Sequence, residues 1–185
     1  ITMNKFKSEY ISISDYNLLI DKQCKQLLKI IKKNNILLIT AESLTAGMIV
    51  SSLVNQPETS SNIYGGVATY FTEAKRRFLN VKEKNVYTHR SAKEMAEGSL
   101  KIVEKDKPNN NLIGISVTGH AGPYYDWREN KNKGINPVNN WGKIHIGISV
   151  LMKNKNNKKN IKQKLNLPKS TSKLNESYDN TVYTD

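Results

Sequence analysis

The sequence predicts an α/β protein: a three-layer αβα sandwich built on a mixed, mostly parallel sheet. Two observations predict this fold. Apolar runs of strand length occur at 36–39 and 112–117, and segments with the apolar spacing of helices alternate with such runs. Helices interleaved with apolar strands are typical of sheets that are covered on both faces. We expect one domain over 1–185, with its core at about 15–152, because 185 residues can bury a single core.

The first half of the chain should supply three helices and two strands. Apolar residues recur at helical spacing from Asp15 to about Asn34, with Cys24 on the apolar side, so Cys24 is expected in the core. The pair Asn34-Asn35 can end this helix. The other expected elements are a strand at 36–40, a helix at 45–54 that stops before Pro57, a strand at 65–70 and a helix at 72–79.

The second half should supply one long helix and three strands. The segment at 91–94, Ser-Ala-Lys-Glu, matches a capping box and predicts a helix from Ser91 to about Ile102. The other expected elements are a buried strand at 112–117, a polar loop at 124–140, another strand at 143–152 and an edge strand at 163–167.

The net charge is unevenly distributed along the chain. The formal charge is +13, from 29 basic and 16 acidic residues, and the lysines at 151–175 supply +8 of it with no acid among them. Eleven of the fourteen residues at 153–166 are Lys or Asn, without interleaved aromatic residues, which is typical of a solvated segment. We therefore expect a Lys/Asn-rich segment at 153–164 and an irregular tail at 168–185. Nucleic acid is not the expected partner.

The number of cysteines and the spacing of the histidines predict neither a disulfide nor a metal site. Cys24 is the only cysteine, and His89, His120 and His145 lack the spacing of metal ligands. We therefore expect no metal and no cofactor. The chain has no apolar run of roughly 18 residues and no charged-then-apolar segment at its start, so a cytoplasmic protein without a membrane partner is expected.

The first candidate site is the turn at Ser43. The segment 40–47 reads Thr-Ala-Glu-Ser-Leu-Thr-Ala-Gly and follows the apolar run at 36–39, so Ser43 should lie between a strand and a helix. Free backbone N–H groups and the helix dipole favour anions at such a turn, and a serine there can act as a nucleophile if a base is present. A helix-capping serine is the simpler interpretation.

Lys75 is the candidate base, because no histidine is placed to serve Ser43. A lysine acts as a base only when desolvation or nearby positive charge lowers its pKa, and the N-terminus of the helix at 72–79 would lower it as well. Tyr70 could relay a proton between Lys75 and Ser43. A solvated surface lysine among charged neighbours, and a tyrosine in the core or at its rim, are the plainer alternatives.

A third candidate is the loop at 118–123, Thr-Gly-His-Ala-Gly-Pro, which follows the strand expected at 112–117. Two glycines after a strand let a ligand approach the backbone, although an ordinary tight loop has the same composition. Ser43, Tyr70 and Gly119 would all lie at the C-terminal ends of strands, where ligands collect in α/β folds.

Five ordered motifs give the chain a specific resemblance. They are Thr40-Ala41-Glu42-Ser43-x-Thr45-x-Gly47, Pro57-x-x-Ser60-Ser61, Val67-x-Thr69-Tyr70-x-x-Glu73-Ala74-Lys75, Glu94-Met95-Ala96-x-Gly98 and Val117-Thr118-Gly119-x-Ala121-Gly122-Pro123. Over roughly 15–150 the chain resembles the CinA C-terminal domain in its stand-alone form, the family of nicotinamide-nucleotide amidases (nicotinamide mononucleotide deamidases).

The resemblance implies an amidohydrolase that converts nicotinamide mononucleotide to nicotinate mononucleotide and ammonia through a serine acyl-enzyme. It implies Ser43 as the nucleophile, Lys75 as the base, Tyr70 as a third catalytic residue, a small-molecule nucleotide as substrate and a homo-oligomer. Backbone N–H groups at 45–47 would stabilise the oxyanion. The substrate-binding residues expected from it are Thr45, Ala46, Gly47, Thr72, Gly119, Ala121 and Gly122.

The chain departs from the family pattern at two places near these residues. Ala46 stands where the family usually has glycine, and Phe71-Thr72 stands where it usually has Ser-Asn. These departures motivate a second hypothesis, a degenerate member that binds a nucleotide or a protein partner without turnover. A third hypothesis is a basic nucleic-acid-binding protein that uses the segment at 153–164.

Overall fold

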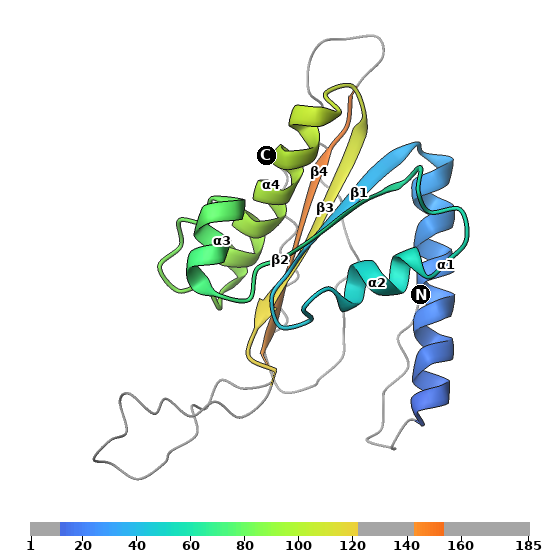
Figure 1. Ribbon diagram of the computed structural model, residues 1–185, viewed down its shortest axis with the longest axis horizontal. Helices are drawn as coiled ribbons and strands as arrows, with labels where there is room; N and C mark the ends of the chain where they lie inside the picture. The colour runs from blue at the N-terminus through green and yellow to red at the C-terminus, as the bar shows by residue number, and fades with distance from the viewer. Residues whose placement is uncertain (1–11, 122–142, 154–185) are drawn as a thin grey trace.

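The structure is a computed structural model that describes residues 12–121 and 143–153 (Figure 1). The four strands form one sheet in the order β2-β1-β3-β4; β1 is parallel to β2 and β3, and β4 is antiparallel to β3. Helices α1 and α2 pack on one face, and α4, with α3 packed against it, covers the other. This is the predicted α/β sandwich. The elements are α1 (Ile13–Lys33), β1 (Ile36–Glu42), α2 (Met48–Val54), β2 (Ile63–Ala68), α3 (Thr72–Leu79), α4 (His89–Asp106), β3 (Asn111–Gly119) and β4 (Ile144–Leu151).

Both ends of α1 have local causes in the sequence. The Ser12 side chain accepts the Asp15 N–H at 3.1 Å and so caps the helix start. Asn34 is the C-cap, and Asn35 adopts a φ of 49°, a conformation that asparagine tolerates. The predicted end of the helix at Asn34-Asn35 is therefore confirmed.

The predicted start of α4 at a Ser91 capping box is wrong. The N-cap is Thr88, whose hydroxyl accepts the Ser91 N–H at 3.1 Å. Glu94 does not close a box with Ser91, because its carboxylate accepts the N–H groups of Lys82 and Glu83 at 2.7 and 2.8 Å. Glu94 thus fixes the loop before α4 instead of the helix start.

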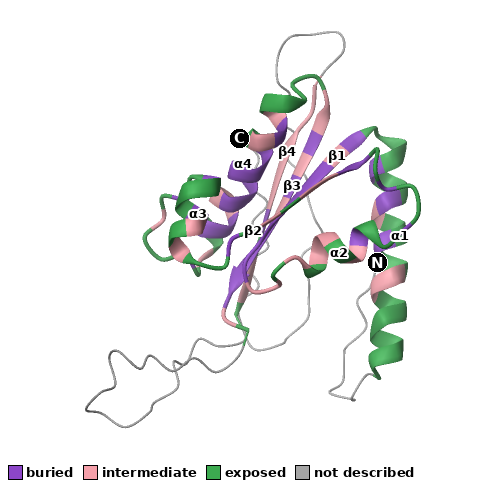
Figure 2. Cartoon of the chain, viewed as in Figure 1, coloured by how far each residue is buried: buried purple, intermediate pink, exposed green. Residues whose placement is uncertain are grey.

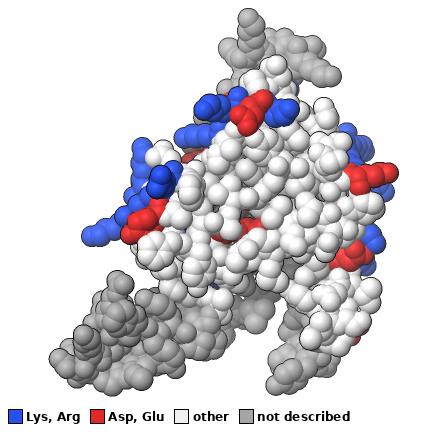
Figure 3. Space-filling view, in the orientation of Figure 1, with Lys and Arg blue, Asp and Glu red and all other residues white. Residues whose placement is uncertain are grey.

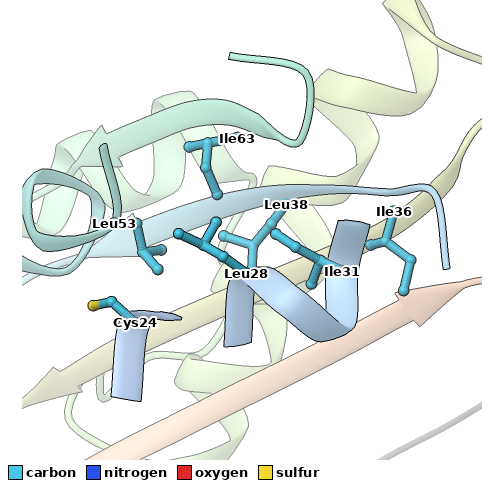
Figure 4. Packing of buried hydrophobic residues seen from close by; sticks show 7 residues of the cluster. All are labelled: Cys24, Leu28, Ile31, Ile36, Leu38, Leu53 and Ile63. Atoms are coloured by element: carbon cyan, nitrogen blue, oxygen red, sulfur yellow. The ribbon is translucent and has the colours of Figure 1, made fainter. Parts of the chain in front are cut away.

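The first hydrophobic cluster lies between the sheet and the helices α1 and α2 (Figure 4). Cys24 is buried within it, as its place on the apolar side of the predicted helix indicated. Each large apolar side chain buried there stabilises the fold by about 1.5–3 kcal/mol, so the cluster attaches both helices to the sheet. Its buried members are Cys24, Leu28, Ile31, Ile36, Leu38, Leu53 and Ile63.

Alternation along β1 decides which face of the sheet each side chain reaches. Ile36 and Leu38 lie in the cluster under α1 and α2, whereas Ile39 and Ala41 lie in clusters with residues of α3 and α4. Side chains of a strand point alternately to its two faces. Even-numbered residues of β1 therefore face α1 and α2, and the odd-numbered series faces α3 and α4.

Burial and charge follow this layered arrangement. Figure 2 shows the strands largely buried or half-buried and the N-terminal half of α1 largely exposed. On the face drawn in Figure 3, Lys and Arg lie at the margins with Asp and Glu among them, and they form no continuous basic stripe over the described residues. No helix in the described ranges is long and apolar enough to span a membrane. The predicted features outside these ranges are the loop at 124–140, the edge strand at 163–167, the tail at 168–185 and nearly all of the segment at 153–164.

Candidate active site

The candidate site lies at the C-terminal ends of β1 and β2. Ser43 directly follows β1, is 3% exposed, and donates its N–H to the Val117 carbonyl oxygen at 3.1 Å. Thr69 directly follows β2 and donates its N–H to the Glu42 carbonyl oxygen at 2.7 Å. Because Glu42 pairs with Ala68 in the parallel register, Ser43 and Thr69 form the next pair beyond the ends of the two strands.

Glu42 closes the N-terminus of α2 with a fully buried carboxylate. Its oxygens accept the N–H groups of Gly47, Ile49 and Val50 at 2.9, 3.0 and 2.9 Å, and the Thr40 hydroxyl at 2.9 Å. Burial raises the pKa of this carboxyl, but the hydrogen bonds, led by those from Val50 and Ile49, outweigh burial and hold the pKa below its ordinary value. Sequence reasoning missed this role, although an acidic residue just before a helix is a signal for it.

The occupied helix N-terminus changes what the turn at Ser43 can bind. The unpaired N–H groups at the start of α2 were expected to favour an anion, but the Glu42 carboxylate already accepts three of them. A second negative group placed there would be repelled by the buried charge. A phosphate is therefore not expected at the N-terminus of α2.

The turn between Ser43 and α2 contains two residues with positive φ, which is 51° at Ala46 and 101° at Gly47. A residue with a β-carbon loses about 1–2 kcal/mol in the left-handed region. Ala46 thus adopts, at a cost, the conformation that glycine adopts freely. Alanine at this position is therefore compatible with a left-handed turn, at the cost of backbone strain.

The free backbone donors of this turn belong to Leu44 and Thr45. Ala46 donates its N–H to the Ser43 carbonyl oxygen at 3.1 Å, and the Gly47 N–H is bound to the buried carboxylate. Within the described chain, the N–H groups of Leu44 and Thr45 have no hydrogen-bond partner. Of the three expected oxyanion donors, only Thr45 remains available, with Leu44 beside it.

Lys75 is fully buried in α3, so the alternative of a solvated surface lysine is wrong. Its Nζ donates to the carbonyl oxygens of Thr69 and Tyr70 at 2.7 and 3.0 Å. Across the described residues it has no acidic partner, and burial lowers its pKa to about 8. The cause is desolvation by the packed fold, and such a lysine can lose its proton near neutral pH.

Tyr70 is brought near this site by its backbone only. Its carbonyl oxygen accepts from Lys75, but its side chain is 75% exposed, and that of the following Phe71 is 71% exposed. Thr72, at the start of α3, is half-buried. The structure therefore gathers Ser43 and Lys75 at one end of the sheet and leaves the Tyr70 ring largely in solvent.

The glycine at the end of β3 is required by strand packing. Gly119 has a φ of 150°, and a β-carbon there would lie 2.2 Å from the Lys143 carbonyl oxygen. The His120 N–H donates to the same oxygen at 3.1 Å. Close approach of Lys143 is thus sufficient to explain Gly119, and its role in substrate binding stays a prediction. Ala121 is exposed, and Gly122 lies outside the described residues.

Three histidines that are far apart in the sequence gather at this end of the sheet. His145 pairs with Thr118 across β3 and β4, His120 follows β3, and His89 opens α4. Burial lowers the pKa of His145, and the positive charges of His89, Lys143 and His120 lower it further. They form no candidate metal site within the described ranges. Sequence reasoning missed the group because only the pairing of β3 with β4 assembles it.

Comparison with known proteins finds similarity over most of the chain. The family model described as the CinA C-terminal domain matches residues 20–172. Similar proteins include a competence-damage inducible protein of Clostridium novyi (strain NT), 37% identical over 127 residues, which are 66% of this chain and 27% of the relative. A CinA-like protein of Chloroherpeton thalassium is 38% identical over 100 residues, which are 51% of this chain and 22% of that relative. The chain thus spans about a quarter of the length of these curated relatives.

Solved structures agree with the sequence comparison. The crystal structure of the competence/damage inducible protein CihA from Agrobacterium tumefaciens matches with a TM-score of 0.55 at 26% identity, over 71% of this chain and 73% of that one. The competence damage-inducible protein A from Klebsiella pneumoniae matches with a TM-score of 0.51 at 28% identity, over 57% and 65%. The chain belongs to the family of the CinA C-terminal domain.

Proposed function

We propose that this chain is an amidohydrolase that converts nicotinamide mononucleotide to nicotinate mononucleotide and ammonia. The observation that carries the proposal is the state of Lys75, which is fully buried, lacks an acidic partner among the described residues and has its pKa lowered to about 8. It lies at the end of the sheet where Ser43 lies. Family membership supports the same site, because Ser43 and Lys75 stand in the motifs on which the resemblance rests.

Acylation begins with neutral Lys75. The Ser43 Oγ attacks the carboxamide carbon while its proton passes to the Lys75 amine, and the carbonyl oxygen becomes an oxyanion. The free N–H groups of Thr45 and Leu44 are the proposed oxyanion donors, each worth about 3–4 kcal/mol in comparable sites. When the tetrahedral intermediate collapses, the ammonium of Lys75 returns the proton to the departing nitrogen, which leaves as ammonia.

Deacylation repeats these steps with water. Neutral Lys75 takes a proton from a water molecule as its oxygen attacks the acyl carbon of the Ser43 ester. The proton then returns to the Ser43 Oγ as the ester bond breaks and nicotinate mononucleotide is released. One buried amine thus serves both half-reactions, and no net proton stays on the protein after a complete cycle.

The nucleotide part of the substrate is proposed to lie away from α2. Because Glu42 occupies the N-terminus of that helix, the phosphate must be bound elsewhere. Thr72 at the start of α3 and Gly119 at the end of β3 flank the position of Ser43, and Ala121 and Gly122 follow Gly119. We place the nucleotide along this edge of the sheet, and a homo-oligomer is part of the same proposal.

An assay of ammonia release tests the proposal. The full chain is incubated with nicotinamide mononucleotide, ammonia is measured by coupled oxidation of a nicotinamide cofactor, and the nucleotide product is identified by mass. We expect ammonia and nicotinate mononucleotide in equal amounts from the wild type. Ser43→Ala and Lys75→Met should lower the rate by a thousandfold or more, in the range seen for removal of an essential nucleophile or base. Lys101→Met, on an exposed position of α4, is the matched lysine control.

The second candidate function is a family member that binds a nucleotide without turnover. The observation that favours it is the 75% exposure of Tyr70, the third residue expected to be catalytic. It predicts that nicotinamide mononucleotide raises the Tm of the wild type while no ammonia appears. That combination would reject the amidase and support the binding protein.

A further inference from the structure

Thr69 carries a buried hydroxyl that nothing in the fold explains. The residue is fully buried, and its Oγ1 has no hydrogen-bond partner among the described residues. A buried polar atom left unpaired costs about 1–3 kcal/mol, so native proteins seldom retain one without a purpose. Thr69 directly precedes Tyr70, to which the sequence interpretation gave the relay of a proton.

The backbone of Thr69 is bound on both sides to the candidate site. Its N–H donates to the Glu42 carbonyl oxygen at 2.7 Å, directly before Ser43 in the chain. Its carbonyl oxygen accepts from the Lys75 Nζ at 2.7 Å. Thr69 is therefore the residue that connects the end of β1 to the buried amine through hydrogen bonds.

Continued one residue past the ends of β1 and β2, strand alternation predicts that Thr69 and Ser43 lie on the same face of the sheet. Val67 of β2 packs in the cluster with Ala41 of β1, on the side of α3 and α4. Thr69 comes two residues after Val67, and Ser43 comes two residues after Ala41, so both continue the series that faces α3. Neighbouring strands lie about 4.8 Å apart, a distance that two hydroxyl-bearing side chains can bridge.

The lone pair of neutral Lys75 needs a hydrogen-bond donor. Two of the directions around its Nζ are taken by the carbonyl oxygens of Thr69 and Tyr70. In the neutral amine the lone pair occupies a third direction, and it needs a donor. The unpaired hydroxyl of Thr69, whose carbonyl oxygen already accepts from the same amine, is the candidate for that donor, whereas the Tyr70 side chain is 75% exposed.

We propose that the Thr69 hydroxyl, which is hydrogen-bonded to neither Ser43 nor Lys75 in the structure, bonds to both when the substrate is bound and then relays the proton between them. This proposal rests on the proposed amidase function. As the Ser43 Oγ forms its bond to the acyl carbon, its proton passes to the Thr69 Oγ1, and the Thr69 proton passes to the Lys75 lone pair. Thr69 ends each transfer unchanged, and Lys75 becomes an ammonium. The reverse transfer delivers the proton to the departing nitrogen.

Paired variants of the full chain separate a relay from a structural role. Thr69→Val removes the hydroxyl and keeps the branched shape, and Thr69→Ser keeps the hydroxyl. We expect Thr69→Val to lower kcat about a hundredfold with KM unchanged, in the range of general acid–base contributions, and Thr69→Ser to restore kcat to within a few-fold. The Tm of Thr69→Val should be equal to or above that of the wild type, because an unpaired buried hydroxyl is lost.

Two results of these assays would overturn the relay. A lower Tm for Thr69→Val with kcat unchanged would show that the hydroxyl is structural. A large loss of kcat in Tyr70→Phe, with Thr69→Val near the wild type, would assign the relay to the tyrosine.

A second measurement keeps the relay testable if nicotinamide mononucleotide is not the substrate. A fluorophosphonate probe forms a bond from the Ser43 Oγ to phosphorus, fluoride leaves, and the serine proton must be removed as in acylation. We expect the wild type to be labelled at Ser43 and Thr69→Val to be labelled about a hundredfold more slowly. If the wild type releases no ammonia but the probe labels it much faster than it labels Thr69→Val, nicotinamide mononucleotide is rejected as the substrate and the relay is retained. Equal labelling rates, or no labelling of the wild type, would overturn the relay.

Discussion

Lys75 and Thr69 are joined by a hydrogen bond of 2.7 Å from the lysine Nζ to the threonine carbonyl oxygen. Together with the bond to Tyr70, it fixes a fully buried amine at the edge of the sheet where Ser43 lies. Carbonyl oxygens orient the amine without the full negative charge that a carboxylate would bring. Burial can therefore lower the pKa of Lys75 to about 8.

The first prediction concerns the pH dependence of ammonia release. Burial disfavours the ammonium, so the pKa of Lys75 lies below its ordinary value of 10.5, at about 8. The protonated, inactive form dominates below this value and the neutral base above it. We expect kcat/KM for nicotinamide mononucleotide to rise about tenfold per pH unit up to about pH 8 and then to level off, because kcat/KM reports groups of the free enzyme.

Steady-state rates between pH 5.5 and 9.5 are the measurement, with circular dichroism at each pH as the control for folding. Lys75→Arg should be inactive throughout, since an arginine stays protonated over this range. A rate that has already levelled off below pH 7 would mean that a different group is the base.

The second prediction concerns the buried carboxylate of Glu42. Glu42→Gln keeps the size of the side chain but turns an –NH₂ group toward backbone N–H donors such as that of Val50. Each buried donor left unpaired costs about 1–3 kcal/mol, so we expect the Tm to fall by several degrees. Thermal unfolding at pH 7 is the measurement. Glu58→Gln, at a side chain that is 88% exposed, is the matched control and should change the Tm little.

The Glu42 carboxylate should also make the folded state less stable at acid pH. The folded pKa of Glu42 lies below its ordinary value of 4.5, so its stabilising contribution is present above pH 4.5 and is lost as the pH falls through the folded value. Glu42→Gln should therefore lose less stability than the wild type between neutral pH and this acid range. If Glu42→Gln and the wild type lose the same stability as the pH falls, other carboxyl groups cause the loss.

Much of the fold could be predicted because its causes are local. Apolar patterns, turn residues and a capping signal together located all eight described elements, and the helix at 72–79 has the predicted bounds. The start of α4 could not be located, because Thr88 and Ser91 both suit an N-cap and only the loop bound by Glu94 decides between them. Capping signals fix the class of an element better than its first residue.

The site could be predicted only in part. Ser43 follows an apolar run, so its place at a strand end was readable from the sequence. The burial of Lys75 was not, because its charged neighbours indicate a surface helix and only the packing of α3 encloses the side chain. The carboxylate of Glu42 and the hydroxyl of Thr69 were missed for the same reason, since their partners or lack of partners depend on how β1, β2 and α2 meet.

The third prediction concerns the contact between α3 and α4. A β-carbon on Gly98 would lie 2.1 Å from the Leu79 carbonyl oxygen at the end of α3. Gly98→Ala should push apart two helices, one of which carries Lys75, and overpacking of this kind costs about 1–3 kcal/mol. We expect a lower Tm and a slower ammonia release. In an unstrained helix the same change would stabilise by about 1 kcal/mol, so a fall in Tm identifies the clash.

Thermal unfolding and the ammonia assay are measured on the same preparations of this variant. Lys101→Ala, an exposed position on α4, is the control and should retain both properties. A Tm above that of the wild type for Gly98→Ala would show that α3 can move away without loss.

The last prediction concerns the strained turn that carries Ser43. Ala46 has a φ of 51°, so Ala46→Gly should relieve about 1–2 kcal/mol of strain while adding freedom to the unfolded chain. The net gain should be about 1 kcal/mol, which corresponds to a rise in Tm of about 2–4 °C for a chain of this size. Ala46→Val, with a branched side chain at the same φ, should lower the Tm. If Ala46→Gly also lowered the Tm, the Ala46 methyl group would have to make a stabilising contact. That contact, and not the backbone preference, would then determine the conformation of the turn.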